Sequence, residues 1–341
     1  MRWHGRAPPG ELLILAGDVG GTNTRLAWFE VSEGRLVPGV TRTYPSQRHT
    51  SLDEIVATFL REAPGTLAHA CIGIAGPVQE GRVVATNLPW GVDARPLAAG
   101  LGLDRVILIN DVEANAWGLA ALPDSDFAVL QPGRPAPTGN AAVISAGTGL
   151  GEAGLVWDGR HHRPVASEAG HADWAPQDDL QGALWRFLAA EVGHVSVERV
   201  LSGPGLHNIY RFLRDAQGLA EPDWLADLLR SEASAPVIGR VGLEGRAEIC
   251  VRALGLFVAI YGAEAGNLGL RVLATAGVYL GGGIAPRLLS ALQGRTFLDA
   301  FAAKGRLRPL LEAIPVRVVL NDQAALVGAA RRAALEAGLL G

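Results

Sequence analysis

Apolar residues recur in short runs that end at glycine turns, and these runs predict two β-hairpins. An apolar run at residues 12–16 enters the turn 17–23, and a second apolar run at 26–29 follows directly. Two short apolar runs joined by a glycine-containing turn are typical of a hairpin. Residues 141–157 repeat this pattern, with a strand, the turn 147–151 and a return strand. We therefore expect one glycine-tipped hairpin in each half of the chain.

Around the hairpins the pattern alternates between strands and helices. A capping box at residues 51–54 starts a helix that ends near Pro64, and Asp93 caps a short helix. The other expected strands are 37–44, 68–75, 82–85, 105–109, 277–280 and 316–320. The other expected helices are 112–122, 178–188, one through residues 210 and 213, 223–229, 244–267 and 323–340. Residues 160–176 are expected to be irregular. Such alternation indicates α/β domains with a largely parallel sheet. The Pro- and Gly-rich residues 132–139 separate the two halves.

The first glycine turn has the composition of a phosphate cradle. Glycines without a Cβ let the backbone turn tightly and bring its N–H groups close to an anion. Asp18 lies at the strand end, where a carboxylate can hold the water shell of a metal ion, and Thr22 and Asn23 add neutral donors beside Gly20 and Gly21. An ordinary hairpin is the structural alternative for this stretch alone. Two further turns, with Gly147, Thr148 and Gly149 and with Gly281, Gly282 and Gly283, each follow a strand. Together the three turns favour a nucleotide site.

The amino-acid composition limits which groups could bind phosphate and which partners are expected. Lys304 is the only lysine among 341 residues, and it lies in neither a P-loop nor a kinase-type strand motif. Phosphate binding would therefore use backbone N–H groups, hydroxyls and a metal ion. The net charge of −4 gives no sign of a nucleic-acid surface. No apolar run approaches the roughly 20 residues of a membrane span. Cys71 and Cys250 lie in apolar runs, so we expect buried free thiols in the cytoplasm.

Polar residues at predicted strand ends and loops supply the candidate chemistry. Asp111 follows a buried strand and is the candidate base for phosphoryl transfer to an alcohol, although an N-cap role for the next helix is compatible with it. A polyol is recognised by amide and carboxylate groups that each satisfy one or two hydroxyls. The residues of this kind in or beside loops are Asn87, Asn110, Glu168, His171 and Glu198.

Two other ligand patterns are unsupported. The spacing Gly149-x-Gly151-x-x-Gly154 matches a dinucleotide fingerprint, but a strand rather than a helix follows it. The Glu168/His171 and Glu191/His194 pairs have metal-ligand spacing, yet the sequence indicates no four-helix bundle and contains no Cys-x-x-Cys. We therefore expect no metal ion held directly by the protein.

From residue 12 onward the sequence resembles the bacterial ATP-dependent glucokinases. The matching segments are 17–23 (Gly-Asp-Val-Gly-Gly-Thr-Asn), 109–111 (Ile-Asn-Asp), 146–151 (Ala-Gly-Thr-Gly-Leu-Gly), 168–171 (Glu-Ala-Gly-His), 194–205 and 281–284 (Gly-Gly-Gly-Ile). Ala169 stands where such sequences often have glycine. The chain lacks the Cys-rich zinc motif of the related repressor and kinase group, which places it in the zinc-free branch.

The resemblance implies the two-domain, actin-like (ribonuclease H-like) α/β fold of the sugar kinases, with a cleft between the domains. We expect a small domain from 11–121 and 324–341, a large one from 122–323, and a loosely ordered extension at 1–10. It implies MgATP on the three glycine turns, Asp111 as base toward the glucose 6-hydroxyl, and Asn87, Asn110, Glu168, His171 and Glu198 on the other hydroxyls. It also implies a cytoplasmic homodimer in glycolysis, with glucose and ATP as partners and neither nucleic acid nor membrane.

Three alternatives remain open. The chain could act on another hexose or use another phosphoryl donor. A sugar-responsive DNA-binding regulator of the same fold would need a helix-turn-helix ahead of the first glycine turn, where only residues 1–10 and one strand stand. A nucleotide-gated module would hydrolyse ATP slowly without sugar.

Overall fold

The computed structural model describes residues 12–62, 66–84 and 88–340. Its internal contacts divide the chain into two units. The first comprises Met1–Asp124, His162–Ala166 and Asn321–Gly341, and the second comprises Ser125–His161 and Ser167–Leu320. The C-terminal segment therefore belongs with the N-terminal part of the chain.

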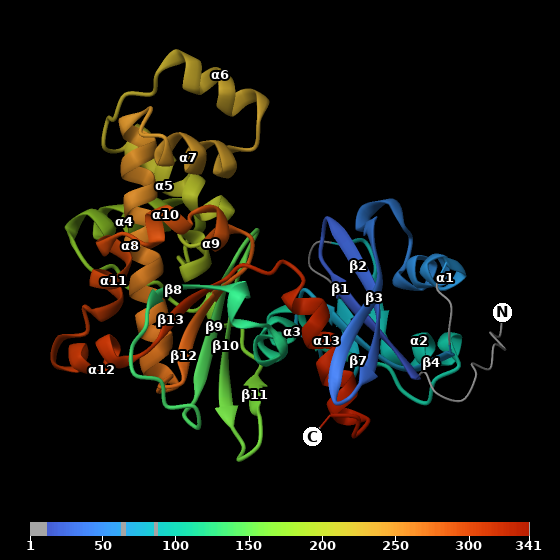
Figure 1. Cartoon of the computed structure of the whole chain (residues 1–341). Coiled ribbons are helices and arrows are strands. Elements are labelled where there is room, and N and C mark those ends of the chain that lie inside the picture. Colours follow the sequence, from blue (N-terminus) through green and yellow to red (C-terminus); the bar gives the residue numbers. More distant parts are fainter. Residues whose placement is uncertain (1–11, 63–65, 85–87, 341) are drawn as a thin grey trace. The chain divides into compact units, whose positions relative to one another are not determined.

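The first unit is built on a five-stranded sheet with the order β3-β2-β1-β4-β7 (Figure 1). Its strands are β1 (Leu12–Val19), β2 (Asn23–Ser32), β3 (Arg35–Pro45), β4 (Thr66–Ile74) and β7 (Ile107–Asn110). The predicted first hairpin is confirmed, because β1 and β2 pair antiparallel. The sheet is mixed rather than largely parallel: β1–β4 and β4–β7 are parallel, whereas β1–β2 and β2–β3 are antiparallel. The expectation was wrong here because two consecutive hairpins build one side of the sheet.

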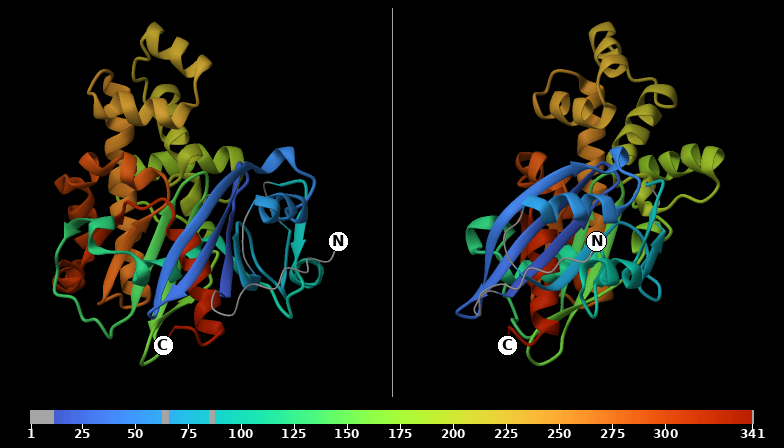
Figure 2. Two further views of the ribbon diagram at one scale, coloured as in Figure 1. Left: turned by 45° about the vertical axis from the view of Figure 1, so that its right-hand side comes forward. Right: turned by 90° about the vertical axis from the view of Figure 1, so that its right-hand side faces the viewer.

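Helices cover both faces of this sheet. Alternate side chains of β1 point to opposite faces, so Leu13 and Leu15 pack in one cluster with Phe59 of α1 (Leu52–Glu62), and Ile14 packs in another. That second cluster contains α3 (Asp111–Gly118) and α13 (Ala324–Glu336). The other elements of this unit are β5 (Arg82–Val84), β6 (Gly91–Asp93), α2 (Ala94–Leu101) and β11 (His162–Val165). Figure 2 shows α1 beside the strands in two further views.

The second unit contributes the strands β10-β9-β12-β13-β8, in this order, to its sheet. They are β8 (Phe127–Gln131), β9 (Ala141–Ala146), β10 (Leu150–Trp157), β12 (Gly277–Gly281) and β13 (Val316–Val319). The second predicted hairpin is confirmed by the antiparallel pairing of β9 and β10. Strand β12 runs parallel to β9, with Gly281 opposite Ser145. The second and third glycine turns therefore leave neighbouring strands at the same edge of the sheet.

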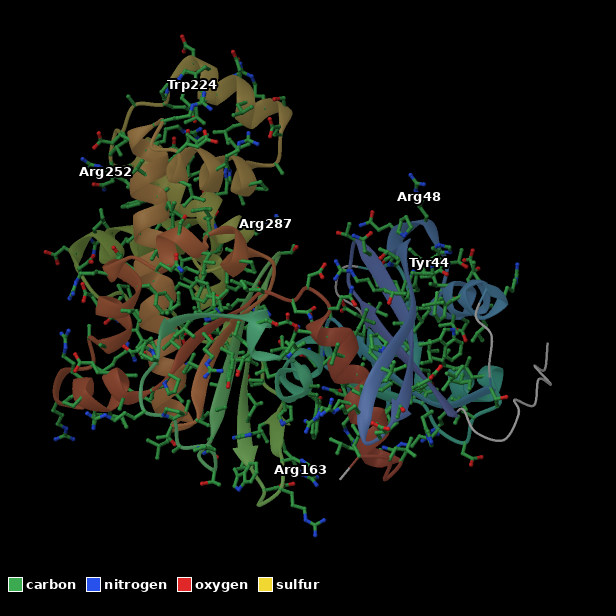
Figure 3. The ribbon with its side chains drawn as sticks, viewed as in Figure 1. Tyr44, Arg48, Arg163, Trp224, Arg252 and Arg287 are labelled. Atoms are coloured by element: carbon green, nitrogen blue, oxygen red, sulfur yellow. The ribbon has the colours of Figure 1, made fainter. Side chains whose placement is uncertain are left out.

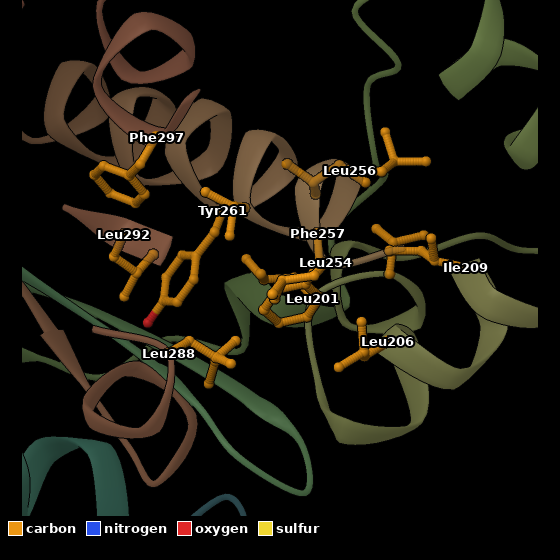
Figure 4. Packing of buried hydrophobic residues seen from close by; sticks show 14 of the residues in the cluster. Leu201, Leu206, Ile209, Leu254, Leu256, Phe257, Tyr261, Leu288, Leu292 and Phe297 are labelled. Carbon is orange, nitrogen blue, oxygen red and sulfur yellow. The ribbon is translucent and has the colours of Figure 1, made fainter. Parts of the chain in front are cut away.

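The core of this unit lies between the sheet and a group of helices. The helices are α4 (Asp179–Val192), α5 (Gly203–Asp215), α6 (Asp223–Ser231), α7 (Ser234–Leu243), α8 (Glu248–Arg271), α9 (Ile284–Arg287), α10 (Leu289–Leu292), α11 (Arg295–Ala302) and α12 (Arg308–Ala313). Tyr261 of α8 is buried and packs between Phe257 of the same helix and Phe297 of α11 (Figure 4). Helix α8 is long and apolar enough to cross a membrane, but most of it is buried inside this unit, as in the core helix of a soluble protein.

Several expected elements need correction. The residues 160–176 contain β11, although they were expected to be irregular. Helix α7 was not expected at all, and the long helix begins at Glu248 rather than near residue 244. The expectation of buried free thiols is confirmed for Cys71 and Cys250.

Candidate active site

The ends of three parallel strands bring the acidic residues of the first unit to one edge of its sheet. Asp18 of β1 lies opposite Gly73 of β4, and the following residue of β4 lies opposite Asn110 of β7. A Cβ on Gly73 would lie 3.9 Å from the Cα of Asp111, so the start of α3 packs directly over this edge. Loops beyond the carboxyl ends of parallel strands are the usual ligand sites of α/β sheets. The structure thus brings Asp18, Asn110 and Asp111 together at one edge of the sheet.

The electrostatics of Asp18 reflect this crowding. Burial, followed by the negative charge of Asp111, raises the pKa of Asp18 from 3.8 to about 6; within this net shift the positive charge of Arg25 lowers the pKa and the negative charge of Asp322 raises it. Arg25 in turn donates from Nη1 to the Asp322 carbonyl at 2.7 Å and lies 3.3 Å from its carboxylate. Asp322 was not among the predicted site residues, although its position directly after a predicted strand could have drawn attention to it.

Asn110 has a structural role that the sequence prediction did not assign to it. Its Oδ1 accepts from the N–H groups of Val112 at 2.8 Å and Glu113 at 3.4 Å, so Asn110 is the N-cap of α3. Its Nδ2 donates to the carbonyl of Gly76 at 3.1 Å. The N-cap role considered for Asp111 therefore falls chiefly to Asn110. Asp111 also accepts from Val112 N–H, at 2.9 Å.

Ser46 supports the first glycine turn with two hydrogen bonds. Its Oγ donates to the carbonyl of Gly20 at 2.7 Å, and its N–H donates to the carbonyl of Thr22 at 2.9 Å. Inside the turn, Gly20 N–H donates to the carbonyl of Asn23 at 2.9 Å. Thr22 and Asn23 remain exposed. The turn is therefore a braced loop with its polar tip open to a ligand, and Ser46 is a supporting residue that sequence reasoning missed.

The second and third glycine turns meet within the second unit. Gly282 has a φ of +78°, and a Cβ there would lie 2.4 Å from the carbonyl oxygen of Ala146, so only glycine fits at this close approach. The second turn is closed by Gly147 N–H donating to the Gly149 carbonyl at 2.9 Å. It is also tied to the start of α5, where Gly203 N–H donates to the Gly147 carbonyl at 2.8 Å.

A cavity of about 1060 Å³ opens beside these two turns. Its walls come from both turns and from α5, α7 and α9, and they are mostly apolar: Gly147, Thr148, Gly203, Pro204, Leu206, His207, Ala233, Ser234, Ala235, Pro236, Gly239, Arg240, Leu243, Glu244, Gly283, Ile284, Arg287 and Leu288. A mostly apolar cavity with a few polar groups and backbone amides at one end suits a nucleotide. Of the predicted residues, Gly147, Thr148 and Gly283 line it.

The charged residues of the cavity wall differ in their partners. Arg240 lies 3.1 Å from Glu232, and Glu244 lies 3.2 Å from Arg246. Arg287, labelled in Figure 3, ends α9 and forms no ion pair with the residues that the structure describes. Burial, followed by the positive charges of Arg211 and Arg214, lowers the pKa of His207 and favours its neutral imidazole. Sequence reasoning missed these residues because no motif marks them.

The predicted sugar-binding residues of the second unit lie on two segments that contact β10. Glu168 precedes the short 3₁₀ turn Ala169–His171, and His171 ends it; both side chains are exposed, with 4.0 Å between Glu168 Oε2 and His171 Nε2. Ser167 anchors this segment, since its Oγ donates to the carbonyl of Glu152 at 2.7 Å. Glu198 accepts a hydrogen bond from Leu150 N–H at 2.8 Å. The structure therefore places these residues around one end of the β9–β10 hairpin.

The remaining predicted residues are Asn87 and the Glu191/His194 pair. Asn87 falls outside the described residues, so the structure places no side chain there. The Glu191/His194 pair is not a joint site, because Glu191 pairs with Arg211 and His194 lies 2.8 Å from Asp173. Within residues 12–62, 66–84 and 88–340, no three His, Cys, Asp or Glu side chains gather as a metal site would require.

The chain is similar to known proteins over almost its whole length. The family model for glucokinase matches residues 15–336. A glucokinase of Nostoc punctiforme is 40% identical over 337 residues, which cover 94% of this chain and 99% of that protein. The crystal structure of a glucokinase from an Antarctic psychrotroph is 31% identical, with a TM-score of 0.83 over 94% of this chain and 98% of that one. A glucokinase of Streptomyces griseus, crystallised with glucose and AMPPNP, shares the fold at 23% identity and a TM-score of 0.59 over 95% of this chain and 99% of that one.

The two α/β units, the glycine turns and the strand-end carboxylates define a sugar kinase of the actin-like ATPase fold. More narrowly, the chain belongs to the glucokinase family, the ATP-dependent glucose kinases. The predicted fold class and family are thereby confirmed.

Proposed function

We propose that this protein transfers the γ-phosphate of ATP to the 6-hydroxyl of glucose, with Asp111 as general base. The observation that carries the proposal is the pair of carboxylates at the sheet edge of the first unit, Asp18 beside the glycine turn and Asp111 at the start of α3. Phosphoryl transfer to an alcohol needs a group that accepts the hydroxyl proton and donors that stabilise charge on the phosphates. Asp111 would take the proton onto a carboxylate oxygen as the hydroxyl oxygen attacks the γ-phosphorus, while the bond from that phosphorus to the bridging oxygen breaks and ADP leaves with the bonding electron pair.

The nucleotide would be held by the glycine turns of both units. Backbone N–H groups suit phosphate oxygens, and the apolar cavity beside Gly147 and Gly283 suits a nucleoside. In the first unit Gly20, Gly21, Thr22 and Asn23 would supply the remaining donors. Arg287 adds a guanidinium at the cavity wall.

We infer that Mg²⁺ accompanies the nucleotide at Asp18. The neighbouring charges of Asp111 and Asp322 help raise the pKa of Asp18, and a divalent cation would relieve this repulsion. Mg²⁺ commonly keeps several waters and uses only one or two protein carboxylates, which fits this donor set. When bound, the ion supplies charge neutralisation on the phosphates.

The sugar would be recognised by hydrogen bonds to its other hydroxyls. We assign this role to Glu168, His171 and Glu198 in the second unit, and to Asn87 and Asn110 in the first. Asn110 already uses both ends of its amide, so it would contribute its second amide hydrogen. Its main effect would be to fix the start of α3 and therefore the position of Asp111.

Replacement of the base tests the proposal. Asp111→Ala is expected to lower kcat by about 10²–10⁴-fold, the usual contribution of a general base, while glucose still binds. The measurements are a coupled assay for glucose 6-phosphate and glucose titration by calorimetry. Asp104→Ala removes an exposed aspartate of the same unit and serves as control. A kcat of Asp111→Ala within threefold of the unaltered enzyme would refute the assignment of the base.

The choice of substrates is tested separately. Glucose, mannose and glucosamine are compared as acceptors, and ATP and polyphosphate as donors, by the yield of phosphate ester. We expect the highest kcat/KM with glucose and ATP. ADP formation that does not depend on sugar would favour the nucleotide-gated module instead.

We further propose that the protein acts in the cytoplasm, at the entry of glucose into glycolysis, as a homodimer. Support comes from its family membership and from its buried free thiols.

A further inference from the structure

The carboxylate of Glu198 is built into the second glycine turn. Its Oε2 accepts from Leu150 N–H at 2.8 Å, immediately after the turn. The same oxygen occupies the space beside Gly149, where an added Cβ would lie 2.6 Å from it. A residue expected to bind sugar thus contacts the turn that we assign to phosphate.

The segment around Glu198 also holds the other end of that turn. Glu198 lies in the 3₁₀ turn Val197–Arg199, and its carbonyl accepts from Ser202 Oγ at 2.8 Å. Ser202 caps α5, and Gly203 next to it donates its N–H to the Gly147 carbonyl at 2.8 Å. Residues 198–203 therefore form hydrogen bonds at both ends of the turn, at Gly147 and at Leu150.

The second carboxylate oxygen of Glu198 remains available. Oε1 has no hydrogen-bond partner in the part of the chain that the structure describes, and the residue is only partly buried. A carboxylate with one oxygen on a backbone amide and the other open can accept from a hydroxyl without giving up its first bond.

We propose that Glu198 is a positioning residue that couples the two substrates, with Oε1 on a sugar hydroxyl and Oε2 on the turn that binds phosphate. The inference rests on the proposed function. A bound sugar holds the carboxylate in one rotamer, and this fixes the turn through Leu150 N–H. A nucleotide then binds to a turn that is already ordered, so it loses less conformational entropy on binding. Because such coupling is reciprocal, nucleotide tightens sugar by the same factor.

Calorimetric titration with ADP, with and without saturating glucose, tests this coupling. For the unaltered protein we expect glucose to tighten ADP by about 5–20-fold, within the usual range of coupling. Glu198→Ala is expected to weaken ADP alone by about tenfold and to abolish the effect of glucose. In Glu198→Gln the amide oxygen can still accept from Leu150 N–H, so ADP alone is expected to bind within threefold of the unaltered protein.

Glu168→Ala is the matched control, because Glu168 is assigned to the same sugar but, among the residues that the structure describes, forms no hydrogen bond or ion pair with the turn. It should weaken glucose, leave ADP alone unchanged, and keep the coupling at saturating glucose. A normal melting temperature of Glu198→Gln shows that the fold is intact.

Unchanged ADP affinity in Glu198→Ala, or a glucose effect that persists in it, overturns the inference. Failure of the unaltered protein to bind ADP refutes the proposed donor site and this inference with it.

Discussion

Asp18 holds a negative charge where the fold disfavours one, so its neutralisation should stabilise the protein. Burial and the charge of Asp111 raise the pKa of Asp18 from 3.8 to about 6. Each pKa unit corresponds to about 1.4 kcal/mol, so the full shift is worth about 3 kcal/mol. Because Asp18 keeps part of its solvent exposure, we expect about 1–3 kcal/mol in practice.

The pH dependence follows from the direction of the shift. Well below pH 3.8 the carboxyl is protonated in both the folded and the unfolded chain, and its contribution to stability vanishes. Between pH 4 and 6 the folded state binds the proton more tightly, so stability falls as pH rises. Above pH 6 the whole penalty is present. Asp18→Asn should therefore be more stable than the unaltered protein at pH 7.5 and nearly equal to it at pH 4.

Urea unfolding followed by tryptophan fluorescence, without nucleotide or Mg²⁺, measures this difference at both pH values. The comparison between the two proteins cancels the titration of all other carboxyl groups. Asp53→Asn, at an exposed aspartate of α1 in the same unit, is the control. An Asp18→Asn variant that is less stable at pH 7.5, or whose advantage is the same at pH 4, would refute the reasoning. If Asp18→Asn is more stable but loses kinase activity, the charge of Asp18 destabilises the fold and is nevertheless required for function.

Two further predictions concern the second unit. Gly149→Ala should displace the Glu198 carboxylate and lower the free energy of unfolding by about 1–3 kcal/mol, because a hydrogen bond to a charged group is lost. The melting temperature of this variant should therefore fall. Gly147→Ala is the control, since a Cβ there meets nothing within 4 Å, and its melting temperature should be unchanged. Lys304→Met should lower the melting temperature by a similar energy, about 1–3 kcal/mol, because Nζ donates to the carbonyl of Ala263 at 2.9 Å and to Asn267 Oδ1 at 2.7 Å. An equal loss in Arg306→Met, at an exposed cation of the same segment, would contradict a specific role for this lysine.

The sequence predicted those features that depend on local pattern. Both hairpins, the capped helices α1 and α4, and the strand ends at Asp18 and Asn110 follow from apolar spacing, glycine turns and cap residues within a few positions of one another. Helix α7 was not predicted because Pro236 and two glycines lower the helix propensity of its sequence. Burial of Val237 and Ile238 in the core nevertheless stabilises the helix.

Features that depend on distant contacts could not be predicted. The cavity beside the second and third turns has α7 as one wall, so it was hidden along with that helix. The bond between Glu198 and Leu150 joins residues 48 positions apart, and no spacing rule announces it. The proximity of Asp322 to Asp18 likewise arises only when β1 and the segment before α13 come together in the first unit. The N-cap of α3, by contrast, is local, and the prediction placed it one residue too late, at Asp111 instead of Asn110.

The half-buried position of Lys304 leaves the protein with an unusual surface chemistry. Every other basic side chain apart from histidine is a guanidinium, since Lys304 is the sole lysine. Its Nζ is engaged by Ala263 and Asn267, and burial lowers its pKa. Among the lysine side chains, acylating metabolites and amine-directed crosslinkers therefore have only the half-buried Lys304 to act on. Modification of Lys304 itself would break two internal hydrogen bonds and register as lost stability.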